Sequence, residues 1–270
     1  MALWHGLNDG QIEIEYNPRH AVPDFQRHFE WREAESQRYR ESHGLPQSLA
    51  YGPGEREAVD LFPYAGSRTT LCFIHGGAWR AGSRANFHYM AQAVQAMGLS
   101  FASIGYPLAP QAGMGAMVKA VAGALTLLAR EVSGDFILSG HSAGAQLASL
   151  LLLSHPAVGR VKGALLVSGL YDLGAVARTT INADVKLTQD EIASCTPFSA
   201  GQAWQTPTCA VVGALETDAF KEESRRILAL APATADQYVA LEGENHFSIV
   251  RQFADPASPL NAQVQALAAG

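Results

Sequence analysis

Several features are scarce in the 270-residue sequence, and each absence excludes a class of protein. Charged residues make up only 16%, with a net charge of −6, so there is no basic surface for nucleic acid and no polybasic membrane patch. No apolar run approaches the length of a membrane span, and the first residues lack the basic start and apolar core of a signal peptide. We therefore expect a cytoplasmic protein that binds neither nucleic acid nor a membrane.

Cysteine and linker sequence are also scarce. The cysteines, Cys72, Cys195 and Cys209, are odd in number and not closely spaced, so we expect reduced core thiols and no metal site. No Ser/Pro-rich stretch, long charge run or internal repeat divides the chain. We expect a single domain over residues 1–270, and the sequence leaves open whether it forms a homodimer.

The sequence does contain apolar runs that alternate with segments of helical periodicity. The runs predict an edge strand at 58–62 and buried strands at 70–74, 101–104, 135–138, 164–167, 208–213 and 238–241. Helical spacing predicts helices at 83–97, 114–128, 145–153 and 219–230. This alternation predicts an α/β fold, with a mostly parallel central sheet covered by helices on both faces.

Two segments fall outside this alternation. An N-terminal extension of about 50 residues includes an amphipathic helix predicted at 24–43, whose role could be packing alone. Residues 171–206 are polar and poorly periodic, and a connection of that length is more often functional than idle. We expect this insertion to be a lid over the site.

The stretch Gly140-His141-Ser142-Ala143-Gly144 joins a predicted strand to a predicted helix. Gly-x-Ser-x-Gly in this context is typical of a nucleophile elbow, a strained turn that exposes the serine hydroxyl. The glycines allow strand and helix to approach closely. We expect Ser142 to be a nucleophile, with the N–H of Ala143 beside the reacting carbon.

A second glycine-rich motif, His75-Gly76-Gly77-Ala78-Trp79, follows the strand at 70–74. Two adjacent glycines there allow main-chain N–H groups to turn toward one point, as in an oxyanion hole. A simple turn is the alternative. We expect the N–H groups of Gly76 and Gly77 to serve together with that of Ala143.

A serine nucleophile needs a base and an orienting acid. His246 follows the last predicted strand and is the expected base, whereas His141 and His75 are expected to be structural. Glu216, on the turn after the strand at 208–213, is the favoured acid. Asp218, a natural cap for the next helix, and Asp172 remain alternatives. Ser142, Glu216 and His246 follow one another in the chain order of an α/β-hydrolase.

The motifs resemble those of α/β-hydrolases of the arylformamidase (kynurenine formamidase) type, related to hormone-sensitive-lipase-like esterases, over most of the chain. The pieces that carry the resemblance are Glu15-Tyr16-Asn17-Pro18-Arg19, Tyr51-Gly52-Pro53-Gly54, Asp60-Leu61-Phe62, the two glycine motifs above, Glu216-Thr217-Asp218-Ala219-Phe220 and Asn245-His246-Phe247. That family usually has Asp at the acid position, where this sequence has Glu216.

The resemblance implies a serine hydrolase that cleaves an N-formyl or small N-acyl arylamine through an acyl-enzyme, without cofactor or metal. A carboxylesterase uses the same groups and is the close alternative, while a non-catalytic binding module is a remote one. The ligand is expected to be a small amide or ester. Aromatic side chains near these loops either line its pocket or pack in the core: Trp79, Tyr106, Tyr171 and Phe247.

Overall fold

The computed structural model describes residues 3–154, 159–232 and 237–270. In this part of the chain the strands form one sheet of eight, in the order β1-β2-β4-β3-β5-β6-β7-β8. β2 pairs antiparallel with β1 and β4, and the remaining neighbours are parallel. The strands are β1 (Gln47–Ala50), β2 (Ala58–Phe62), β3 (Thr69–Ile74), β4 (Ser100–Ile104), β5 (Asp135–His141), β6 (Val161–Val167), β7 (Thr208–Gly213) and β8 (Tyr238–Leu241).

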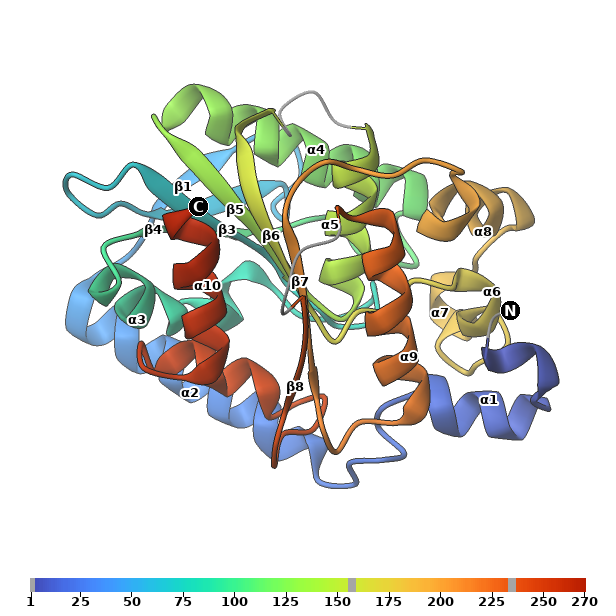
Figure 1. Cartoon of the computed structure of the whole chain (residues 1–270). Coiled ribbons are helices and arrows are strands. Elements are labelled where there is room, and N and C mark those ends of the chain that lie inside the picture. Colours follow the sequence, from blue (N-terminus) through green and yellow to red (C-terminus); the bar gives the residue numbers. More distant parts are fainter. Residues whose placement is uncertain (1–2, 155–158, 233–236) are drawn as a thin grey trace.

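Helices cover both faces of the mostly parallel sheet, so the predicted α/β fold is confirmed (Figure 1). The α-helices are α1 (Asp9–Tyr16), α2 (Phe25–His43), α3 (Met90–Ala96), α4 (Met114–Glu131), α5 (Ala143–Ser154), α6 (Leu173–Val176), α7 (Asn182–Val185), α8 (Gln189–Cys195), α9 (Asp218–Arg226) and α10 (Pro259–Ala269). Short 3-10 helices are η1 (Leu3–Gly6), η2 (Arg84–Phe87), η4 (Pro197–Ser199), η5 (Ile227–Leu230) and η6 (Ile249–Ala254).

Alternation along the strands divides the core into two layers. In β5, Phe136 and Leu138 face the layer that includes α4, α5 and α9, while Ile137 faces the layer that includes α3 and α10. Both layers bury apolar side chains. The sequences of these strands are therefore continuously apolar and do not alternate between apolar and polar residues. Burial of this kind supplies the main free energy of folding.

The structure contains elements that the sequence patterns did not predict. Strand β1 pairs its Gln47 to Ala50 with β2, and α1 and α10 complete the N- and C-terminal regions. The predicted helix at 83–97 is divided into η2 and α3. Most of these elements are short or have a weak apolar face, so their periodicity is weaker than that of α4 or β5.

The segment at 171–206 is more ordered than its polar composition predicts. It forms α6, α7, α8 and η4, and it buries Val176, Ile181 and Val185 against the main core. Its α-helices are four to seven residues long, too short to show a clear 3.6-residue period. Within the described residues no helix is long and apolar enough to cross a membrane.

Candidate active site

The turn between β5 and α5 holds Ser142 in a strained backbone conformation. Its φ is +56°, in the left-handed region that non-glycine residues seldom adopt. Glycines flank it because no side chain fits: a Cβ on Gly140 would lie 2.3 Å from the Gly144 carbonyl oxygen, and a Cβ on Gly144 would lie 2.0 Å from that of Ile74. The sequence motif therefore forms the tight strand-to-helix turn that it predicts, and Ser142 faces a cavity.

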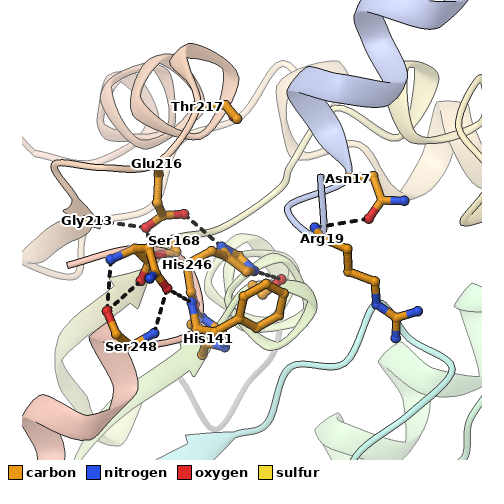
Figure 2. Close-up of polar contacts among 12 residues, drawn as sticks. Asn17, Arg19, His141, Ser168, Gly213, Glu216, Thr217, His246 and Ser248 are labelled. Carbon is orange, nitrogen blue, oxygen red and sulfur yellow. Dashed lines mark hydrogen bonds and ion pairs between the residues drawn. The ribbon is translucent and has the colours of Figure 1, made fainter. Parts of the chain in front are cut away.

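The imidazole of His246 lies between Ser142 and Glu216. Its Nε2 is 3.1 Å from the Ser142 Oγ. Its Nδ1 is 2.7 Å from the Glu216 Oε2, a contact that Figure 2 shows. A carboxylate can only accept, so Nδ1–H donates to Glu216 and the Nε2 lone pair is left to accept from the serine hydroxyl. All three side chains are buried. This is the arrangement of hydroxyl, base and acid that activates a serine nucleophile.

Glu216 is held on both oxygens, and neither alternative acid reaches His246. The Glu216 Oε1 accepts from the Ser168 hydroxyl at 2.6 Å and from the Gly213 N–H at 2.7 Å (Figure 2). Asp218 begins α9 with its side chain 84% exposed. Asp172 instead caps α6 by accepting from the Gly174 N–H. Of the three candidate acids, only Glu216 contacts the imidazole.

The expectation that Asp218 caps the helix after it was wrong. Thr217 is the N-cap residue of α9, and its side chain makes no cap hydrogen bond. The free N–H of Ala219 is satisfied by the Glu15 carboxylate at 3.0 Å, and the Thr217 hydroxyl donates to the Glu15 carbonyl oxygen. The cap therefore comes from α1, at the other end of the chain, where no local pattern could show it.

The loop that carries His246 is fixed by its neighbours. Asn245 Oδ1 accepts from the N–H groups of Phe247 and Ser248, both at 2.9 Å. His141 adds a link from the elbow, since its Nε2–H donates to the His246 carbonyl oxygen at 2.9 Å. Burial, together with the nearby His246, holds the pKa of His141 well below its usual value, so this ring stays neutral.

His75 is also a buried neutral ring. Burial lowers its pKa to about 4, and its Nδ1–H donates to the Gly76 carbonyl oxygen at 2.7 Å. The ring stacks on Tyr106, with centroids 4.4 Å apart. Neither His75 nor His141 contacts the Ser142 hydroxyl, in agreement with the structural roles expected from the sequence.

Three main-chain N–H groups near Ser142 have no acceptor among the described residues: those of Gly76, Gly77 and Ala143. Gly76 lies against the nucleophile, because a Cβ on it would be 3.2 Å from the Ser142 Cβ and 2.7 Å from the His141 carbonyl oxygen. Gly77 has a φ of +127°, which favours glycine. The predicted oxyanion N–H groups are thus free to bind a ligand atom.

Ser142 and His246 open into a cavity of about 240 Å³. Its sheet side consists of these two residues, His141, Phe247 and the loop 76–82. Its other side comes from the N-terminal region, namely Asn17, Pro18, Arg19, Phe29, Arg32 and Glu33. We call these the sheet wall and the N-terminal wall. Leu170 and Ile181 also line the cavity, so the segment at 171–206 contributes one described residue.

Two of the four predicted pocket aromatics line this cavity, Trp79 and Phe247. Tyr106 and Tyr171 do not, which corrects the prediction for both. The Tyr106 hydroxyl donates to the His75 carbonyl oxygen at 2.8 Å, which holds it behind the oxyanion loop. Tyr171 is fully buried, and its N–H donates to the Glu223 carboxylate at 3.0 Å, beneath α9. Proximity in sequence to the strand ends was not sufficient to place these rings.

The N-terminal wall is the part of the cavity lining that sequence patterns missed. Helix α2 was predicted, but nothing in its periodicity marked Phe29 or Arg32 as cavity residues. The Arg32 guanidinium lies 4.5 Å from the Phe29 ring and 5.1 Å from the Phe87 ring. Among the described residues it has no hydrogen-bond or ion-pair partner, and burial lowers its pKa to about 10. The only sequence feature that pointed to this wall was Asn17-Pro18-Arg19, which was among the motifs that carry the family resemblance.

The sheet order, the elbow and the sequence order of its three contacting residues define a hydrolase of the α/β type. The chain belongs to the α/β-hydrolase family, because a family model of the alpha/beta hydrolase fold matches residues 71–234.

Its relatives include two kynurenine formamidases, which confirm the resemblance seen in the motifs. One from Salmo salar is 28% identical and covers 94% of this chain and 95% of its own. One from Danio rerio is 26% identical and covers 94% of each. Among solved structures, a protein from Silicibacter sp. tm1040 assigned as a thioesterase has a TM-score of 0.83 at 26% identity, covering 93% of this chain and 98% of its own. The Pyrobaculum calidifontis esterase, at 20% identity and TM-score 0.66, covers 91% and 94% and shares the fold.

Proposed function

We propose that this hydrolase cleaves an N-formyl or small N-acyl arylamine through an acyl-enzyme on Ser142. The observation that carries the proposal is the line of contacts from Ser142 through His246 to Glu216 at the wall of a cavity. The similarity to kynurenine formamidases over 94% of the chain supports an amide substrate. A non-catalytic binding module is disfavoured because the relatives are enzymes.

The proposed reaction has two halves. In the first, the Ser142 Oγ attacks the acyl carbon while His246 Nε2 takes its proton, and the N–H groups of Gly76, Gly77 and Ala143 stabilise the oxyanion. The imidazolium, oriented by Glu216, then gives the proton to the departing arylamine, which leaves an acyl-serine. In the second half, water loses a proton to His246 and attacks the acyl-serine, which releases the carboxylic acid and restores the Ser142 hydroxyl.

The cavity has the chemistry that an aryl substrate needs. Aromatic side chains line it, including Phe29 of the N-terminal wall, Phe247 of the sheet wall and Phe87 of η2. These rings can pack on a second ring in offset or edge-to-face geometry. Arg32 adds an unpaired guanidinium between two of them, which would bind an oxygen atom or a carboxylate on the substrate.

A carboxylesterase is the second candidate, because solved structures with this fold include esterases and the same groups cleave esters. The comparison of formanilide with p-nitrophenyl acetate separates the two. We expect kcat/KM on the formamide to be at least as large as on the ester. Fast ester cleavage with negligible formamide cleavage would favour the esterase instead.

Replacement of the nucleophile tests the mechanism itself. Ser142→Ala should abolish labelling by a fluorophosphonate and lower kcat on either substrate by roughly 10⁴-fold or more, because the acyl-enzyme cannot form. Circular dichroism would check that the variant folds. A Ser142→Ala protein that labels as well as the parent would refute the assignment of the nucleophile.

A further inference from the structure

The serine that follows β6 has a backbone conformation that non-glycine residues seldom adopt. Ser168 has a φ of +49°, and it is fully buried. Of the other described non-glycine residues with positive φ, Ser142, Ala78 and Trp79 belong to the elbow and the oxyanion loop, and Lys186 ends α7. Such conformations are strained and persist where the surrounding structure enforces them, often at active sites. Ser168 shares this property, although it lies outside the cavity lining.

Its contacts show what the conformation achieves. The Ser168 N–H donates to the Val211 carbonyl oxygen at 2.8 Å, which ties the residue to β7. Its hydroxyl donates to the Glu216 Oε1 at 2.6 Å, a short bond to a carboxylate. Hydrogen bonds of this kind, with one charged partner, are about twice as strong as neutral ones. In Figure 2, Ser168 and His246 approach the same carboxylate.

A glutamate needs this restraint more than an aspartate would. Its extra methylene adds a rotatable bond, so the Glu216 carboxylate could turn away from His246 unless its second oxygen were fixed. The Gly213 N–H, at the end of β7, donates to that oxygen. The Ser168 hydroxyl, just after the neighbouring strand β6, donates to the same oxygen. We propose that Ser168 is a positioning residue, whose hydroxyl holds the Glu216 carboxylate so that it faces His246.

This inference rests on the proposed function, so its test uses reactions that do not depend on the preference for amide or ester. The readouts are the rate of Ser142 labelling by a fluorophosphonate and the kcat and KM for p-nitrophenyl acetate. Ser168→Ala should lower the labelling rate and kcat roughly tenfold, from the loss of one hydrogen bond to a charged group. KM should stay unchanged, because Ser168 does not line the cavity.

A second variant separates the hydroxyl from the backbone. Ser168→Gly removes the hydroxyl but relieves the positive φ, so we expect the same tenfold loss as for Ser168→Ala. Full activity in Ser168→Gly with loss in Ser168→Ala would assign the effect to the backbone and overturn the inference. Ser168→Cys, a near match in size with a weak donor, should fall between parent and Ser168→Ala.

Coupling to the acid provides the decisive comparison. In the Glu216→Gln background, Ser168→Ala should leave the residual labelling rate unchanged, because the carboxylate it positions is gone. An equal loss with and without the carboxylate would mean a merely structural role and would overturn the inference. Ser103→Ala, which removes a buried strand hydroxyl bonded to the Arg84 carbonyl oxygen, is the matched control for folding and should leave kcat unchanged.

The two proposals fail in different ways. A folded parent whose Ser142 resists fluorophosphonate would overturn the proposed function and this inference together. A parent that labels at Ser142, with a Ser168→Ala variant that labels equally fast, would overturn this inference alone.

Discussion

The two walls of the cavity are built by different means. The sheet wall comes from short loops at the carboxyl ends of β3, β5 and β8, each fixed by local backbone geometry and by bonds such as that from His141 to the His246 carbonyl oxygen. The N-terminal wall comes from the turn after α1 and from α2, before the residues matched by the family model. Because the two walls differ in this way, we predict that the sheet wall governs the reaction and that the N-terminal wall governs which substrate fits.

After replacement of Ser142 itself, the largest expected effect tests the acid behind the sheet wall. Glu216→Gln should lower kcat by roughly 10²- to 10⁴-fold, because an amide no longer stabilises the imidazolium or fixes its tautomer. The matched control is Asp218→Asn, whose side chain is 84% exposed and 3.8 Å from Lys221. Its kcat should stay within about twofold of the parent, since surface changes of this kind are small.

Steady-state kinetics on p-nitrophenyl acetate would measure both variants. A large loss in Asp218→Asn with little loss in Glu216→Gln would reverse the assignment of the acid. It would also mean that the acid loop rearranges around the substrate.

Sequence patterns predicted the sheet wall because its reactive side chains and glycines occur in short, local motifs. Glu216 could be preferred to Asp218 as the acid because Glu216 lies on the turn after β7, whereas Asp218, two residues later, begins α9. Contacts between segments that are far apart in the sequence produce no local motif of this kind. Ser168 reaches Glu216 across 48 positions, and Arg32 reaches the cavity only because α2 packs beside η2. The prediction that Tyr106 and Tyr171 line the pocket was wrong for the same reason, since their hydrogen-bond partners come from other elements.

A second prediction concerns the stability of the fold in acid, through the buried His75 that precedes the sheet-wall loop 76–82. Burial lowers the pKa of His75 to about 4, whereas in the unfolded chain it should be near 6.5. Because the unfolded state takes up the proton first, the free energy of unfolding should fall as pH drops from about 6.5 to 4, by roughly 3 kcal/mol in full. His141 should contribute in the same direction.

Urea unfolding at pH 7.5 and pH 4.5 would measure this loss. His75→Asn removes the titrating ring but can keep a donor for the Gly76 carbonyl oxygen, so its stability should depend less on pH than that of the parent. An unchanged dependence in His75→Asn would show that His75 does not contribute, and that other groups cause the loss in acid.

The smallest expected effect tests the N-terminal wall. Arg32→Met removes a guanidinium that has no acceptor among the described residues, so folding should lose little beyond its stacking on Phe29 and Phe87. KM for 2-formamidobenzoate, which carries a carboxylate, should rise roughly tenfold, while KM for neutral formanilide and both kcat values stay within about twofold. Arg27→Gln, an exposed change on the same helix, should alter neither KM. Equal changes for the two substrates would make Arg32 a packing residue, and a large loss of kcat would show that the two walls do not act separately.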